Sequence, residues 1–387
     1  MDRARLRKRW LALHLWIGLP LGALLALLGV TGSALVFYLE LDRWLNPAIQ
    51  VPVRTEAALV GAQVSPQQVL QRLRTAYPDL TGPWRIELPD GASSPVMVRY
   101  QRPPERAGRA FAPRMVTLNP QTLEITSDRY WGDFLATWLY DLHYTLLWDG
   151  VGRTVVGWLG VAMVLSLLSG LWLWWPSRQR LGAALRPVLR PGPVRRTYDL
   201  HVLPGVYAWI GLLLLAVTGV GLAWPDVTRA VMGAPAANVP LPAARSAPPN
   251  GSMPAPLMSL DAAMTVAQLE FPQADVRWIE SSGSQGEPIV LRLHQSFEPG
   301  RRFPQTRVWV DPFTGELLAR RDPAQQGSSE TVLAWLHPLH NAEILGLPGR
   351  LLYAVLGLLP LLAWVTGLLR WRQKRRARRK SINPTSV

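Results

Sequence analysis

Four long apolar runs constrain this chain more than any other feature. They cover about residues 11–38, 154–175, 202–224 and 350–371, and a helix that crosses a bilayer needs roughly 20 such residues. The first run is longer than the apolar part of a secretory signal, and no clear cleavage site follows it. We therefore predict four membrane-spanning helices, of which the first is a retained anchor.

Basic residues set the predicted orientation. The net charge is +15, and 19 of the 41 Lys and Arg residues lie in three short segments, 3–9, 178–196 and 370–380. Each segment adjoins an apolar run, which by the positive-inside rule predicts that both termini and the middle loop are cytoplasmic. The rest of the chain is almost neutral. The charge therefore indicates a lipid bilayer as the partner, and no nucleic acid.

Residue spacing indicates an internal duplication. After Leu13-His14 come a glycine and a Thr-Gly pair, and the same residues follow Leu200-His201 at the same offsets. The matching positions are Gly18 and Gly205, then Thr31-Gly32 and Thr218-Gly219. A second set, Trp138, His143, Arg153 and Gly170, is spaced as Trp335, His340, Arg350 and Gly367. Each outer segment also has a helix start at a serine and a hairpin around an Asx-Pro turn.

The predicted fold is an α-helical membrane protein, with four transmembrane helices in a duplicated 2+2 arrangement and two extracytoplasmic α+β domains. Its segments are listed here in chain order: a cytoplasmic N-terminus (1–10), the first span (11–38), a first periplasmic α+β domain (40–135), an outer interfacial segment with the second span (136–175), a cytoplasmic Arg-rich loop (176–199), the third span (202–224), a second periplasmic α+β domain (226–330), an outer interfacial segment with the fourth span (331–371), and a cytoplasmic basic tail (372–387).

Histidine placement indicates what the spans hold. Five of the six histidines lie at the ends of apolar runs, and only His294 lies in an outer domain. In the predicted topology His14 and His201 lie near the cytoplasmic face, and His143 and His340 lie near the outer face. Each of these residues could instead be an interfacial histidine bonded to backbone or headgroups. Together they supply one pair on each side of the membrane.

Two neutral imidazoles facing each other across a helix bundle suit the axial ligation of a non-covalent haem. Zinc would require three or four ligands, and copper would recruit Met or Cys. The chain has no cysteine, which excludes Cys-attached haem and iron–sulfur clusters. We expect two such haem groups, with a single haem as the alternative. His337 is an alternative ligand, a contact to the haem, a substrate-side residue or a packed interfacial residue. Glycines 18, 22, 29, 205, 211, 219 and 221 could admit a macrocycle or serve helix packing.

The sequence resembles that of the PepSY-associated transmembrane family. The resemblance is carried by Leu13-His14 with Gly18, by Leu200-His201 with Gly205, and by the hairpin Asp311-Pro312-x-Thr314-Gly315-Glu316. The four-span layout with two outer domains is most similar to the ferric-siderophore reductases of that family, which are iron-regulated proteins of the bacterial inner membrane. The resemblance implies b-type haem held by membrane histidines. The first domain departs from the pattern, with Asn119-Pro120 and Leu123 in place of Asp-Pro and Gly.

The expected function is that of an inner-membrane haem-b protein that reduces a periplasmic ferric siderophore and releases Fe(II). No nucleotide motif occurs, so electrons would come from a donor such as quinol or a cytoplasmic flavin reductase. Trp131, Trp309, Trp335 and Arg301-Arg302 are candidates for the substrate surface. The alternatives are a non-enzymatic, membrane-anchored PepSY binding or regulatory module, and an iron or siderophore permease component. The absence of an obvious broken-helix pattern argues against the permease.

Overall fold

The computed structural model describes residues 2–50, 64–91, 94–188, 192–234 and 257–382. The chain divides into two compact units. We call them the helical unit (Met1–Tyr38, Leu139–Pro225 and Leu336–Val387) and the sheet unit (Leu39–Trp138 and Asp226–Trp335). The predicted basic tail (372–387) lies outside the described residues from position 383 onward.

The helical unit contains two long apolar helices, α7 (Asp149–Trp174) and α14 (Gly346–Ile382). Among the described residues, these two are long and apolar enough to cross a membrane. The other two predicted spans are each divided into two helices, α1 (Arg3–Gly18) with α2 (Gly22–Leu35), and α9 (Pro193–Tyr207) with α10 (Trp209–Ala223). Counting each bent pair as one span gives up to four. The chain is therefore a membrane protein with two to four candidate spans.

The two bends are 57° between α1 and α2 and 65° between α9 and α10. Pro20 lies in the first break and Pro204 lies in the last turn of α9. A proline lacks the amide hydrogen that continues a helix, and its ring crowds the preceding turn, so both breaks have a local cause. The sequence analysis found no obvious broken-helix pattern, so these two breaks were not predicted.

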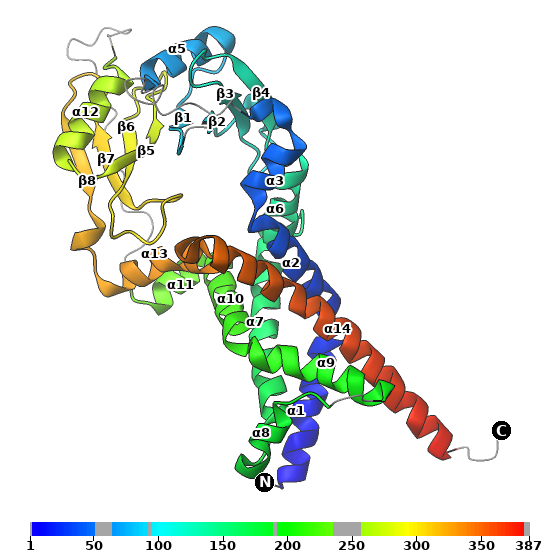
Figure 1. Ribbon diagram of the computed structural model, residues 1–387. Helices are drawn as coiled ribbons and strands as arrows, with labels where there is room; N and C mark the ends of the chain where they lie inside the picture. The colour runs from blue at the N-terminus through cyan, green and yellow to red at the C-terminus, as the bar shows by residue number, and fades with distance from the viewer. Residues whose placement is uncertain (1, 51–63, 92–93, 189–191, 235–256, 383–387) are drawn as a thin grey trace. The chain divides into compact units, whose positions relative to one another are not determined.

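Each bent pair changes its packing partner at the bend. Helix α1 packs on α7 while α2 packs on α14, and α9 packs on α14 while α10 packs on α7 (Figure 1). Glycines allow the close approach, because a Cβ on Gly29 would lie 2.3 Å from the carbonyl oxygen of Gly357. Gly22 and Gly211 lie in the same way against Trp364 and Leu356. These three glycines serve helix packing.

Two arginines bind the carbonyl groups at the ends of the bent pairs. The Arg350 guanidinium donates from Nε and from a terminal nitrogen to the Val36 oxygen, at 3.1 and 2.7 Å. Arg153 donates to the Leu222 oxygen at 3.2 Å, near the end of α10. A cation at a helix C-terminus satisfies orphan carbonyl groups and complements the helix dipole. The two arginines thus tie α14 to α2 and α7 to α10.

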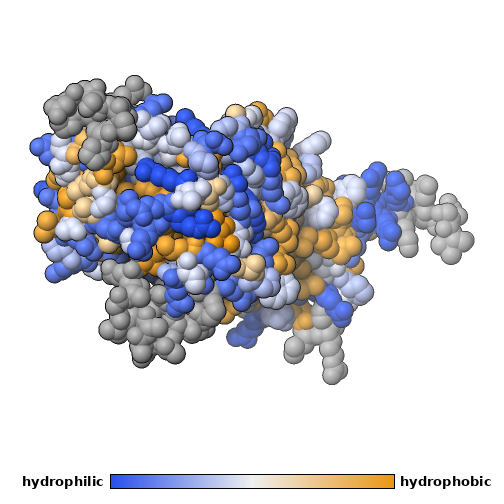
Figure 2. Space-filling view, turned by 90° about the horizontal axis from the view of Figure 1, so that it is seen from above, coloured by the Kyte–Doolittle hydropathy of each residue, from blue (hydrophilic) through white to orange (hydrophobic). Residues whose placement is uncertain are grey.

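The C-terminal end of α14 is hydrophilic and adjoins a hydrophobic stretch of the same helix (Figure 2). Large apolar side chains along that stretch, among them Leu351, Leu352, Val355 and Leu358, are exposed. An apolar surface of this kind next to a basic end is typical of a helix that enters a bilayer.

The sheet unit is built around one antiparallel sheet of eight strands in the order β4-β3-β2-β1-β5-β6-β7-β8. The strands are β1 (Trp84–Glu87), β2 (Val96–Tyr100), β3 (Arg114–Leu118), β4 (Ile125–Tyr130), β5 (Asp275–Glu280), β6 (Ile289–His294), β7 (Thr306–Val310) and β8 (Leu317–Arg321). The two outer segments were expected as separate domains, but β1 pairs with β5 and joins them, with Ile86 opposite Ile279. Pairing these strands removes two exposed sheet edges.

Two helices cover one face of the sheet. They are α5 (Pro66–Ala76) and α12 (Leu260–Glu270), and each begins at a serine, Ser65 or Ser259, whose hydroxyl accepts an amide hydrogen of the first turn. The core between helices and sheet includes the fully buried Trp84, Leu73 and Leu291. The remaining helices are α3 (Tyr38–Leu45), α6 (Leu135–Thr145), α8 (Leu181–Ala184), α11 (Pro225–Val231) and α13 (Ser328–His340).

Candidate functional site

The helical unit brings four histidines together in two pairs. His14 on α1 and His201 on α9 have ring centres 6.3 Å apart, with an angle of 81° between the ring planes. His143 on α6 and His340 at the end of α13 have ring centres 6.2 Å apart, at 48°. Each pair thus takes one histidine from each half of the chain.

The four imidazoles share one hydrogen-bonding pattern, in which Nδ1 contacts a hydroxyl group on another helix. His14 contacts Ser169 Oγ at 3.0 Å, and His340 contacts Thr218 Oγ1 at 3.0 Å. His143 and His201 contact Thr31 and Thr366, each at 3.1 Å, and each also contacts a backbone oxygen at 3.0 Å. The imidazoles are therefore held by α7, α10, α2 and α14.

This pattern fixes the protonation of each ring. Every one of the four hydroxyls donates its single hydrogen to a carbonyl group of its own helix, as Thr218 does to Leu214 at 2.7 Å. The hydroxyl oxygen must then accept from the histidine, so Nδ1 carries the hydrogen. Nε2 is left with a lone pair, and within the described parts of the chain no hydrogen bond involves it. This is the form in which imidazole binds a metal.

A glycine follows each of these hydroxyl residues and lies against the ring. A Cβ added to Gly32, Gly170, Gly219 or Gly367 would lie 3.0 to 3.2 Å from Cε1 of the histidine that the preceding residue binds. Any larger residue would press on the imidazole. Each of the four histidines thus contacts a Thr-Gly or Ser-Gly pair, which we call its seat. These pairs are visible in the sequence, but the sequence analysis did not assign their role.

The spacing of the rings fits two ligands on opposite sides of one metal ion. A metal–imidazole bond of about 2 Å and a further ~1.1 Å to the ring centre would separate two axial imidazoles by about 6 Å. Across the described residues, no group of three or more His, Asp or Glu side chains could hold a metal ion. Because each pair supplies two imidazoles, it suits an ion whose remaining ligands belong to a bound group, as in a porphyrin. A Cβ on Gly18 or Gly205 would meet no heavy atom within 4 Å, so there is room one turn from His14 and His201.

The two remaining histidines lie outside these pairs. His337 Nδ1 accepts from the Asn341 side chain at 3.2 Å, which holds its ring near the end of α13. His294 lies on β6, where its Nε2 contacts the Glu298 carbonyl oxygen at 3.3 Å. Neither residue belongs to a pair of facing imidazoles.

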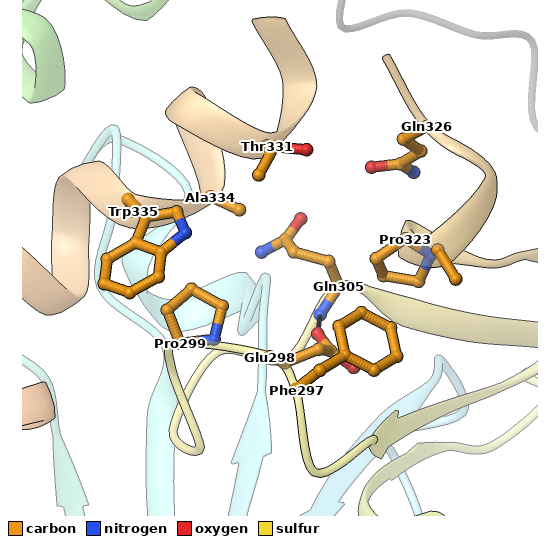
Figure 3. A pocket seen from close by; sticks show the side chains of 10 residues that line it. Phe297, Glu298, Pro299, Gln305, Pro323, Gln326, Thr331, Ala334 and Trp335 are labelled. Atoms are coloured by element: carbon orange, nitrogen blue, oxygen red, sulfur yellow. Dashed lines mark hydrogen bonds between the residues drawn. The ribbon is translucent and has the colours of Figure 1, made fainter. Parts of the chain in front are cut away.

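A separate pocket of about 210 Å³ lies within the sheet unit (Figure 3). The rings of Trp335 and Phe297 lie on opposite sides of it, the Gln305 amide lies between them, and Thr331 lies above them in the view of Figure 3. Of the predicted substrate-surface residues, Trp335 therefore lines a pocket. Trp131 and Trp309 are buried, and Arg301 forms ion pairs with Asp90 and Asp275.

Comparison with known proteins gives one match over most of the chain. A family model described as the PepSY-associated TM region matches residues 11–374. No curated protein matches the chain.

Proposed function

The chain belongs to the PepSY-associated transmembrane family, and from that premise we propose that it is an inner-membrane haem-b protein that carries electrons across the membrane and reduces a periplasmic ferric siderophore. The observation that supports this best is the pair of neighbouring imidazoles about 6 Å apart, present twice, with each Nε2 available as a ligand. The duplicated 2+2 arrangement of spans belongs to the same proposal.

His14 with His201, and His143 with His340, would hold the two haem groups. Bound haem b supplies one-electron transfer between the ferric and ferrous states of its iron. The hydroxyls of Ser169, Thr218, Thr31 and Thr366 keep the hydrogen on Nδ1 and fix the ring orientation, which raises the basicity of Nε2. The glycine of each seat leaves space for the imidazole ring, because it has no side chain.

The basic segments support the direction of transfer. Segment 3–9 lies in the first half of α1, and segment 178–196 ends in the first turn of α9. The His14 and His201 pair would therefore lie on the cytoplasmic side by the positive-inside rule. The start of α1 and the end of α14 both lie toward the lower end of the helical unit in Figure 1, which supports cytoplasmic termini. His143 and His340 precede α7 and α14 and would lie on the periplasmic side.

Reduction explains how iron would be released. The oxygen ligands of siderophores suit hard Fe(III) far better than Fe(II). One electron delivered to the chelate converts Fe(III) to Fe(II), which dissociates and leaves the chelator intact. The electrons would come from a quinol or a reduced flavin on a separate protein, since the chain has no nucleotide-binding motif.

The first test is a visible spectrum of the detergent-purified protein, before and after dithionite, with pyridine haemochrome quantification. We expect a b-type reduced spectrum and about two haems per chain. His14→Ala or His201→Ala should remove one haem, and His143→Ala or His340→Ala the other, while His294→Ala serves as the matched control. A colourless protein expressed with ample haem would overturn the proposal in favour of a binding or regulatory module.

A permease component is a second candidate, because two of the spans are bent. Interrupted helices at the bilayer interior are a feature of transporters, and the bends of 57° and 65° remove an objection that the sequence raised. Gallium(III) chelates separate the two functions, since gallium cannot be reduced under these conditions. Uptake of a gallium chelate into proteoliposomes would favour the permease, and reduction of the iron chelate without gallium uptake would favour the reductase.

A further inference from the structure

The face of the sheet opposite α5 and α12 carries a group of cations. Side chains alternate between the two faces along a strand, and the core residues Ile86, Ile279, Leu291 and Val308 face the helices. The residues next to them therefore lie on the second face. We call the following set the arginine face: Arg85, Arg99, Glu87, Trp278, Glu280, Arg292 and Arg307.

The acids of the arginine face are already paired. Glu280 binds Arg85 at 2.6 Å, and Glu87 binds Arg99 at 3.1 Å. Arg292 and Arg307 lie directly opposite each other on β6 and β7. Within the described ranges neither of them forms an ion pair, and Nε of each is buried without a hydrogen-bond partner. Like charges at directly opposite positions of two strands destabilise a sheet.

The charges in this part of the face do not balance. Arg85, Arg292 and Arg307 carry three positive charges against the single negative charge of Glu280. Burial is the largest cause that lowers the pKa of Arg292, and with the charges of the neighbouring Arg307 and Arg85 it brings that pKa to about 9. Burial and Arg321 likewise lower the pKa of Arg307 to about 10. Both groups remain cationic at neutral pH, and an anion placed between them would relieve their repulsion.

Trp278 holds this arrangement in place. Its ring lies between two guanidinium groups, with Arg85 at 4.8 Å and Arg292 at 4.9 Å from the ring centre. Phe303 packs on the ring edge-on at 5.4 Å. Stacking on an aromatic ring fixes the plane of an arginine fork. The donors of Arg292 are therefore oriented before any ligand binds.

We propose that Arg292 and Arg307 form a binding site for the carboxylate groups of an anionic ferric chelate. Arginine forks match the two oxygens of a carboxylate in a bidentate geometry. A surplus of two positive charges suits a polycarboxylate chelate, whereas a neutral or cationic hydroxamate complex offers no such group. The inference rests on the proposed function and adds the class of substrate.

The test uses the full-length protein in detergent and gallium(III) citrate, a polycarboxylate chelate that cannot be reduced. Binding is measured by calorimetry for the unaltered chain, Arg292→Gln and Arg307→Gln. Each substitution should weaken binding by about tenfold or more, since it removes charge-assisted hydrogen bonds. Arg320→Gln is the matched control, because Arg320 lies on the same sheet and binds Glu270 at 2.8 Å beside α12.

Stability distinguishes a binding role from a structural one. Because Arg307 repels Arg292, Arg307→Gln should leave thermal stability unchanged or raised while binding falls. A large loss of stability would mean that the arginines hold the sheet, and would overturn the proposal. Equal binding of gallium citrate by all variants, or equal competition by inorganic phosphate, would also overturn it. Gallium desferrioxamine B, which has no free carboxylate, should bind all variants alike.

The outcome is independent of the haem test. Arginine-dependent binding of gallium citrate by a protein without haem would keep the site and remove the electron-transfer function. Haem in the expected amount without any gallium citrate binding would do the reverse.

Discussion

The imidazoles of His14 and His201 lie with their ring centres 6.3 Å apart, although they belong to different halves of the chain. Their Nδ1 atoms contact helices α7 and α14, which is possible because α1 and α9 cross to opposite long helices. The bends in the two spans and the histidine pairing are thus one arrangement. Because each bent pair changes its packing partner at the bend, the rings of two histidines that are far apart in the sequence lie next to each other.

Removal of the hydroxyl that orients His340 should weaken haem binding at that pair. Thr218→Val keeps the side-chain shape but loses the oxygen that accepts from Nδ1. Loss of such an outer partner typically costs about 10–100-fold in affinity for a metal group. Haem titration of the apoprotein measures this. Thr154→Val is the control, because the Thr154 hydroxyl bonds to its own helix at Gly150, and equal weakening by both variants would contradict the assigned role.

An added methyl group at Gly170 should displace the ring of His14. The new Cβ would lie 3.1 Å from Cε1, closer than an ordinary contact. We expect Gly170→Ala to lower the haem content of the His14 and His201 pair and to leave the other pair unchanged, as read from the haem stoichiometry and the reduced spectrum.

Gly150→Ala is the control for this substitution. Gly150 lies in the same helix, where a Cβ would meet nothing within 4 Å. If Gly170→Ala retained both haems with unchanged spectra, the seat described for His14 would be wrong.

Loss of the cation at the end of α2 should loosen the packing of α2 on α14. Arg350→Gln removes two hydrogen bonds to the Val36 carbonyl group. Hydrogen bonds to charged groups contribute about 1.5–3 kcal/mol, so thermal stability should fall and amides at the end of α2 should exchange faster. Arg372→Gln, an exposed position of the same helix, should have little effect. Unchanged exchange near Val36 would contradict this account.

Acid should weaken the sheet unit through Asp128. Arg114 binds both carboxylate oxygens at 2.8 and 2.6 Å, and the Tyr77 hydroxyl donates at 2.9 Å. Burial acts to raise the pKa of the Asp128 carboxyl, but the hydrogen bonds from Arg114 and Tyr77 outweigh it and lower the pKa. The unfolded carboxyl titrates near pH 4, about its ordinary value. The stabilisation is therefore complete above that pH and is lost as the pH falls through the lower, folded pKa.

Hydrogen exchange of β3 and β4 in the full chain measures this effect, after correction for intrinsic rates. Protection should fall between pH 6 and pH 3 in the unaltered protein, with a smaller fall in Asp128→Asn. Asp79→Asn, at an exposed position, should behave like the unaltered protein. The same pH dependence in all three proteins would exclude Asp128 as the cause.

The sequence predicted the apolar runs and the family, and both follow from patterns that are local in the chain. The bend near Ala208 was not predicted, because Pro204 lies inside α9 and a proline in an apolar run does not always break a span. The choice of α7 or α14 as packing partner depends on contacts such as Gly29 with Gly357, which no local pattern specifies.

The same reasoning applies to the sheet. The sequence predicted two small α+β domains, and each of them alone would have had an exposed edge strand. The pairing of β1 with β5 gives both edge strands a hydrogen-bonding partner. The residues that contact the histidines were not predicted from the sequence either. Ser169 and Thr366 lie far from their partners in the chain, and only the repeated Thr-Gly or Ser-Gly pair could have pointed to them.

The division of each histidine pair between the two halves of the chain also sets an order of events during synthesis. His14 and His143 are synthesised first. Their partners, His201 for His14 and His340 for His143, are synthesised later. The seat of His201 is completed only by Thr366 and Gly367 in the last helix. An ion that needs both imidazoles of a pair can therefore be loaded only when biogenesis is nearly finished. Under the proposed function, a prematurely terminated chain would therefore lack a complete haem site at either pair.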